Sequence, residues 1–88
     1  MPMTVRSGDN VVIHCNATGE QPIRVEWHTS DRQPLPRSIR VRGTYLEFHA
    51  ITPVDAGRYF CTAENVHGNV TKVAEVIVSN RKCHSFYF

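Results

Sequence analysis

The sequence predicts an all-β fold, a sandwich of two antiparallel sheets. Apolar and polar residues alternate over short segments, and turn-forming residues separate these segments. No segment repeats its apolar residues at the 3.6-residue spacing of an amphipathic helix. The stretch from Asp55 to Cys61 adds a third observation, because Asp, Gly, Tyr and Cys follow one another at two-residue steps. Tyr59 and Cys61 therefore share one face of a strand, while Asp55 and Gly57 suit the turn before it.

The first two strands follow from this alternation. We expect one strand over Val11 to Thr18, after a turn signal at residues 7–10, with Cys15 on its apolar face. A turn then leads to a second strand over Arg24 to His28, in which Trp27 lies on the apolar face.

The middle of the chain predicts two more short strands. Residues 39–42 form an edge strand whose Ile39 and Val41 are expected to point into the core. Gly43 turns the chain, and Leu46 and Phe48 form the inward face of the next strand.

The last two strands are predicted as a hairpin. The first carries Tyr59, Cys61 and Ala63 on its inward face, and residues 65–68 form the connection. The second covers residues 70–78, with an inward face of Ala74, Val76 and Val78.

Length and composition limit the classes of protein. The 88 residues make one domain, predicted over residues 1–80, and residues 81–88 read as linker or non-native tail. With 20% charged and 41% hydrophobic residues the composition is globular, and a net charge of +2 does not favour nucleic acid. No apolar run is long enough for membrane insertion, and residues 1–3 do not begin a secretory signal. We therefore expect one module of a larger protein.

The candidate chemistry does not indicate an enzyme. The five histidines have neither the helical spacing nor the cysteine partners of a zinc site. No glycine-rich phosphate loop or pair of catalytic acids is present in the sequence. We expect no catalytic residues, no metal and no cofactor. The histidines are His14, His28, His49, His67 and His84.

The order and spacing of Cys15, Trp27 and Cys61 resemble those of immunoglobulin domains, in which a Cys, a Trp and a second Cys lie on three core strands. The chain between Trp27 and Asp55 is too short for the two extra strands of a variable domain, and residues 63–68 resemble the final hairpin of intermediate-type (I-set) domains. The match covers about residues 4–79. Four further positions fit the family pattern, namely Leu46, Asp55, Gly57 and Tyr59.

Four short segments are closer to one group of relatives. They resemble the immunoglobulin repeats of basement-membrane heparan sulfate proteoglycans. The segments are residues 26–28, 35–36, 41–43 and 50–57.

The resemblance implies a disulfide between Cys15 and Cys61, and a hydrogen bond from the Tyr59 hydroxyl to backbone. Two buried thiols are the alternative for the cysteine pair. The third cysteine, Cys83, lies in the tail, where an intermolecular disulfide is the functional alternative to a linker without a role.

Two N-x-Thr sequons begin at Asn16 and Asn69. Asn16 faces away from Cys15, and Asn69 starts the last strand, so both side chains are expected to reach solvent. Glycosylation at either asparagine is consistent with the secretory route.

Four arginines between residues 32 and 42 form a candidate site for sulfated glycans, because a guanidinium pairs with sulfate through two hydrogen bonds. The alternative is a charged edge strand that resists pairing with another chain. By family similarity, Arg40 has a further expected role as the ion-pair partner of Asp55. The arginines are Arg32, Arg37, Arg40 and Arg42.

The outer face of the sheet that contains Trp27 and the final hairpin is a second candidate contact surface. Three apolar residues, Phe60, Val73 and Ile77, are expected there among Glu26, His28 and Thr62.

The resemblance implies a non-catalytic extracellular module, which acts as a spacer and protein-binding unit in a matrix or cell-adhesion protein. Its expected partners are extracellular proteins and neighbouring immunoglobulin repeats. The alternatives are a ligand-binding ectodomain module of a cell-surface receptor and a weak heparin-binding module.

Overall fold

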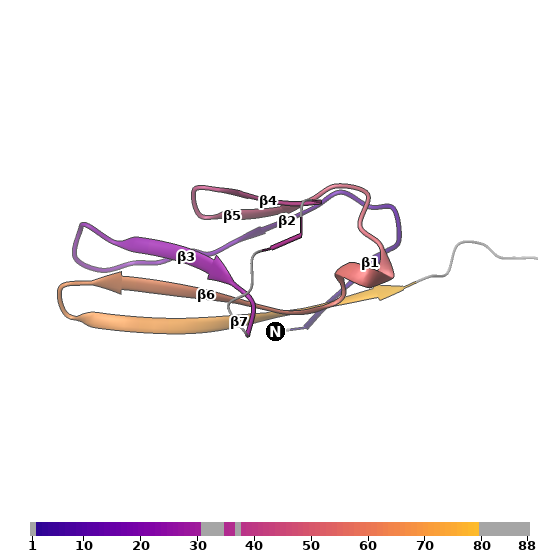
Figure 1. The fold of residues 1–88 in the computed structure, drawn as a ribbon. Helices are drawn as coiled ribbons and strands as arrows, with labels where there is room; N and C mark the ends of the chain where they lie inside the picture. Colours follow the sequence, from indigo (N-terminus) through magenta and orange to yellow (C-terminus); the bar gives the residue numbers. More distant parts are fainter. Residues whose placement is uncertain (1, 31–34, 37, 80–88) are drawn as a thin grey trace, which may run out of the picture.

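The computed structural model describes residues 2–30, 35–36 and 38–79, and these form a two-layer β-sandwich (Figure 1). One sheet has four strands in the order β1-β7-β6-β3, and the other has three in the order β2-β5-β4. A 3₁₀ helix, η1, connects the layers between β5 and β6. The elements are β1 (Pro2–Arg6), β2 (Val11–His14), β3 (Arg24–His28), β4 (Ile39–Arg42), β5 (Tyr45–Phe48), η1 (Pro53–Asp55), β6 (Gly57–Asn65) and β7 (Gly68–Ser79).

The predicted sandwich is confirmed, with one addition at its edge. Strand β1 pairs in parallel with the end of β7, from Pro2 opposite Glu75 to Arg6 opposite Ser79. The other strand pairs are antiparallel, so the four-stranded sheet is mixed. Pro2 is tolerated because it is the first residue of an edge strand, where a missing N–H disrupts least.

The core lies between the two sheets. Phe48, Leu46, Ile51 and Val76 have the largest completely buried side chains. Because successive strand residues point to opposite faces, the inward positions of β5 and β7 supply three of these four. Burying one such side chain stabilises the fold by about 1.5–3 kcal/mol.

The long β6–β7 hairpin forms the centre of the four-stranded sheet. Its register runs from Gly57 opposite Val76 to Asn65 opposite Gly68, with Val66 and His67 in the turn. The backbone amide of His67 donates to Asn65 Oδ1 at 2.9 Å. The predicted hairpin connection at residues 65–68 is therefore confirmed.

Strand β2 differs from its prediction because it ends at His14 and not at Thr18. Its partner β5 begins at Tyr45, so the ladder has no further strand residue to pair with. One backbone hydrogen bond, from Cys15 to Thr44 at 3.0 Å, lies beyond the end of the strand.

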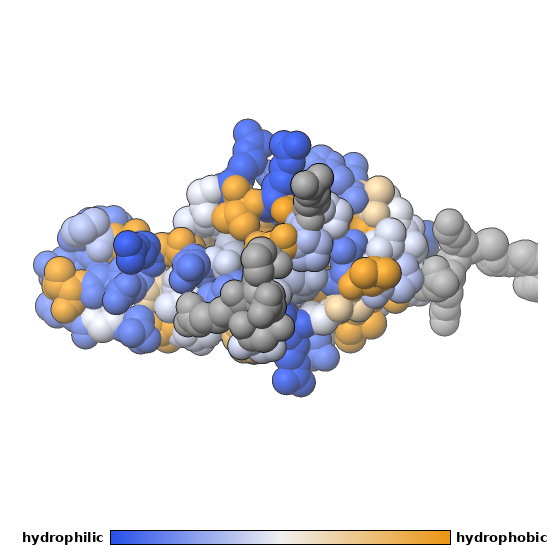
Figure 2. Space-filling model, in the orientation of Figure 1, coloured by the Kyte–Doolittle hydropathy of each residue, from blue (hydrophilic) through white to orange (hydrophobic). Residues whose placement is uncertain are grey.

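Strand β4 lies at an edge, as predicted, but the expected burial of Val41 is wrong. Ile39 is buried, whereas Val41 is 48% exposed. Val41 lies opposite the buried Leu46, but the outermost strand of the sheet has no neighbour on its far side. Figure 2 shows apolar surface beside strongly hydrophilic side chains where β4 and β5 lie.

Candidate functional site

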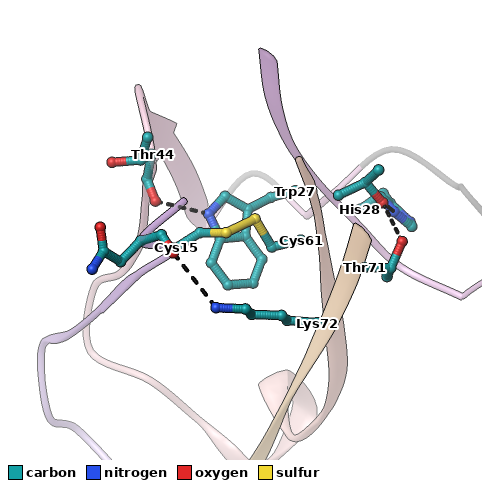
Figure 3. The surroundings of a disulfide bond; sticks show 9 residues. Cys15, Trp27, His28, Thr44, Cys61, Thr71 and Lys72 are labelled. Carbon is teal, nitrogen blue, oxygen red and sulfur yellow. Dashed lines mark hydrogen bonds between the residues drawn. A yellow bond between two sulfur atoms is a disulfide. The ribbon is translucent and has the colours of Figure 1, made fainter. Parts of the chain in front are cut away.

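The disulfide between Cys15 and Cys61 joins the two sheets, with 6.4 Å between the Cα atoms. Both residues are buried, and the S–S bond between them excludes the alternative of two buried thiols. Trp27 lies opposite Cys61 on β3, and its indole N–H donates to the Thr44 carbonyl at 3.0 Å (Figure 3). The bridge and the indole therefore connect both layers at one level of the sandwich.

Tyr59 fixes the start of β6. Its hydroxyl donates to the Asp55 carbonyl at 2.6 Å, and its ring meets the edge of Phe48 with centroids 5.3 Å apart. Burial, with the nearby Asp55 charge, raises the pKa of Tyr59. Gly57 lies between Asp55 and Tyr59 and has a φ of +149°. Residues with a Cβ rarely adopt this conformation, so a glycine is required at this position.

Asp55 is a buried carboxylate that organises its own turn. Its Oδ2 accepts the Thr52 backbone N–H at 3.0 Å, and its Oδ1 accepts the Ser38 hydroxyl at 3.5 Å. The expected ion pair with Arg40 is wrong: none of the ion pairs among the described residues joins Arg40 to Asp55. Arg40 lies on the exposed edge strand, opposite Glu47.

The predicted arginine group is only partly described. Arg42 forms an exposed ion pair with Glu47, with 3.7 Å between Nη1 and Oε2. Arg40 lies beside the same glutamate in the strand register. Arg32 and Arg37 lie outside the described residues, as does Cys83 in the tail. The carboxylate of Glu47 therefore offsets part of the positive charge on β4.

We call the outer face of β1, β7, β6 and β3 the four-strand face. Phe60 lies opposite both His28 and Val73, and its ring stacks on His28 with centroids 5.8 Å apart. His28 Nε2 lies 2.9 Å from Thr62 Oγ1, which lies 2.9 Å from Thr71 Oγ1. Two aromatic rings and a valine thus lie beside a line of hydroxyl groups.

The structure does not bring Ile77 into this cluster. Ile77 and Val73 are each 44% exposed on the same face of β7. The charged row of Arg58 opposite Glu75 lies between them. The apolar contact patch therefore consists of Phe60 and Val73, with His28 at its edge.

A second exposed cluster lies on the outer face of β2, β5 and β4, which we call the three-strand face. The rings of His14 and Tyr45 stack with centroids 4.4 Å apart and 22° between their planes. Sequence reasoning missed this pair, because the two residues are distant in sequence and only the strand register brings them together. The outward position of each residue in its alternating strand was the available signal.

The two sequons occupy exposed positions. Asn16 follows the disulfide-bonded Cys15, and Asn69 is the second residue of β7. Both border a cavity of about 440 Å³ between the loop over residues 15–23 and the β6–β7 hairpin. His67 is one of its lining residues, and His67 Nε2 lies 2.7 Å from Glu20 Oε1.

Two other features are absent from the residues that the structure describes. No three or more His, Cys, Asp or Glu side chains in that part of the chain gather as a metal site would require. No helix there has the length and apolar character to cross a membrane.

Comparison with known proteins agrees with this geometry. The model of the immunoglobulin I-set domain matches residues 1–78. The chain is 34% identical over 67 residues to the basement membrane-specific heparan sulfate proteoglycan core protein of Mus musculus, and 37% identical over 76 residues to a peroxidasin homolog of Homo sapiens. These alignments cover 76% and 81% of the chain, but it spans only 2% and 5% of those proteins.

A solved structure gives the same result. The chain superimposes on an immunoglobulin domain in the crystal structure of the titin M10–obscurin-like 1 complex with a TM-score of 0.73 and 31% identity. The match covers 93% of this chain and 89% of that chain. The sequence resemblance to I-set domains, and to the basement-membrane proteoglycan known as perlecan, is confirmed.

Proposed function

Because the chain belongs to the immunoglobulin I-set family, we propose that it is a non-catalytic extracellular module, a spacer and protein-binding unit in a matrix or cell-adhesion protein. The observation that carries this proposal is the buried disulfide between Cys15 and Cys61. Disulfides persist in secreted proteins and are rare in the reducing cytosol. The names of relatives, a basement-membrane proteoglycan and the cell adhesion molecule Dscam2 of Drosophila melanogaster, support the same location.

The spacer role rests on the rigidity of the frame. The disulfide and the Trp27 hydrogen bond each tie together segments that are distant in the sequence, and the Tyr59 hydrogen bond fixes the turn that leads into β6. Closing the loop between the cysteines contributes about 4 kcal/mol in the chain-entropy model, which is comparable to the whole stability of a small domain. A domain held in this way keeps its shape between neighbouring immunoglobulin repeats.

The four-strand face is the surface proposed for an extracellular protein partner. Phe60 and Val73 form its apolar centre, and the hydroxyls of Thr62 and Thr71 border it. An apolar centre with a polar rim is the usual composition of a protein contact. Glycans on the two sequons are part of the same proposal, since both asparagines are exposed.

The experiment expresses the 88-residue chain behind an added secretion signal in cells that deposit a basement-membrane matrix. We expect an oxidised, secreted chain that is retained in the matrix, and loss of retention in Val73→Glu. The control is Val54→Glu, because Val54 is 88% exposed on η1 and belongs to neither sheet face.

Three outcomes would contradict parts of the proposal. A chain that is secreted with reduced Cys15 and Cys61 would exclude the extracellular assignment. Binding to the surface of cells that make no matrix would favour a receptor ectodomain module instead. Equal retention of the Val73→Glu and Val54→Glu variants would exclude the four-strand face as the contact.

A further inference from the structure

The three-strand face carries a second site, built from two rows of outward side chains. In one row His14 lies opposite Tyr45, which lies opposite Arg42. In the other, Val12 lies opposite Glu47, which lies opposite Arg40. Directly opposite residues in antiparallel strands hold their Cβ atoms about 4.5–5.5 Å apart. Arg42 of the edge strand therefore lies next to the aromatic pair in the strand register.

Apart from Glu47, the side chains of this face are open to solvent. Tyr45 is 44% exposed, Val12 is 56% exposed and the Arg42 side chain is 75% exposed. The His14 and Tyr45 rings stack on each other, so one face of each is covered, and the ring edges and outer faces form the apolar surface beside a group that makes charge-assisted hydrogen bonds. A ligand that fits has a flat apolar face and an anionic group next to it.

The balance of charge distinguishes the two faces of the sandwich. Two arginines and one glutamate point outward on the three-strand face, a net charge of +1. Three arginines and three glutamates point outward on the four-strand face, a net charge of 0. The latter are Arg6, Arg24, Arg58, Glu26, Glu64 and Glu75. The three-strand face is therefore the more positive of the two.

We propose that the three-strand face binds an anionic polysaccharide. A sugar ring packs on the stacked His14 and Tyr45 rings, and a sulfate or carboxylate of the same chain pairs with Arg42. Arg40, two residues away on the same edge strand, meets the next anionic group. The site is separate from the proposed protein contact, so either proposal can fail without the other.

Glu47 sets the strength of the site. Its carboxylate lies 3.7 Å from the Arg42 guanidinium, in the position where a ligand anion competes for the same donors. The Glu47 side chain is only 20% exposed, so it stays close to the sheet. Removing its charge should therefore increase the affinity for the polysaccharide, which a purely structural role of these residues does not predict.

The test titrates a heparin oligosaccharide into the unglycosylated, oxidised 88-residue chain and follows the backbone amide signals by NMR. We expect signals of β2, β5 and β4 to shift. Arg42→Ala should weaken binding about threefold to fivefold, as expected for one exposed ion pair. Tyr45→Ala should weaken it comparably, and Glu47→Gln should strengthen it. Affinity should fall steeply with added salt.

The chain offers closely matched controls on the opposite face. Arg24 pairs with Glu64 at 4.0 Å and is 81% exposed, so Arg24→Ala removes the same charge from an equivalent ion pair. We expect Arg24→Ala and Glu64→Gln to leave the affinity unchanged. Equal effects of Arg42→Ala and Arg24→Ala would overturn the proposal in favour of general charge attraction. Binding that is insensitive to Tyr45→Ala, with polyglutamate competing as well as heparin, would indicate an acidic peptide site and also overturn it.

Discussion

Replacing Tyr59 by Phe removes one buried hydroxyl and little else. The hydroxyl donates to the Asp55 carbonyl at 2.6 Å, and Tyr59 is 6% exposed. Phenylalanine preserves the ring, and with it the edge contact to Phe48. The variant therefore measures the loss of a hydrogen bond together with a carbonyl left without its partner.

We expect the free energy of unfolding to fall by about 1–3 kcal/mol, the cost of leaving one buried acceptor unsatisfied. For a domain of this size a loss of about 2 kcal/mol lowers Tm by about 8–16 °C. Urea denaturation followed by Trp27 fluorescence measures the change. The control is Tyr45→Phe, since Tyr45 is 44% exposed and an exposed substitution changes stability by at most about 0.5 kcal/mol.

The same variant has a signature at alkaline pH. Burial and the Asp55 charge raise the folded pKa of Tyr59, so the folded state holds the phenol proton more tightly than the unfolded state. The resulting stability is complete below the unfolded pKa of about 10 and is lost as pH rises through the folded value. Tyr59→Phe should lose less stability over that range than the unaltered chain. Equal stability of Tyr59→Phe and the unaltered chain at neutral pH would refute the assigned hydrogen bond.

Three other predictions concern the frame and the surface. Replacing Cys15 and Cys61 by Ala should cost about 4 kcal/mol in a urea melt, and peptide mapping that links either one to the tail cysteine would contradict the framework. Asp55→Ala should lower the free energy of unfolding by about 1–3 kcal/mol, because the Thr52 amide loses its acceptor. Arg40→Ala should change it by at most about 0.5 kcal/mol, since Arg40 has no ion pair with Asp55. A similar loss for both variants would indicate that the two residues do form an ion pair. Made in a secretory host, the chain should lose mass on enzymatic deglycosylation, and unchanged mass would show that both sequons are empty.

The sequence predicted the strands in which apolar and polar residues alternate clearly. Trp27, Leu46, Tyr59 and Val76 each lie on an inward face, where burial decides the orientation of the whole strand. Strand β1 was missed because its hydrogen-bonding partner, the end of β7, lies more than seventy residues away in the sequence. The available local signal was the short alternation of Met3 and Val5 with exposed residues.

The surface was harder to predict than the core. Alternation places Val41 inward, but the degree of burial depends on what covers an edge strand. The register between β2 and β5 decides that His14 meets Tyr45, and no single segment contains that information. The expected ion pair of Arg40 with Asp55 was inferred from family similarity. In the structure, Asp55 instead accepts hydrogen bonds from Thr52 and Ser38.

The parallel pairing of β1 with β7 has a mechanical consequence for a module in a tandem array. Tension on the chain before Pro2 and after Ser79 pulls the two strands in opposite directions along their length. The hydrogen bonds of their ladder are then loaded together in shear, and they do not open one at a time as they do in a hairpin pulled apart at its ends. Once this ladder breaks, the disulfide still holds Cys15 and Cys61 together. The loop between these cysteines, which are 46 positions apart in the sequence, therefore cannot extend under load. The bridge therefore limits how far an unfolded repeat can extend before tension passes to the next one.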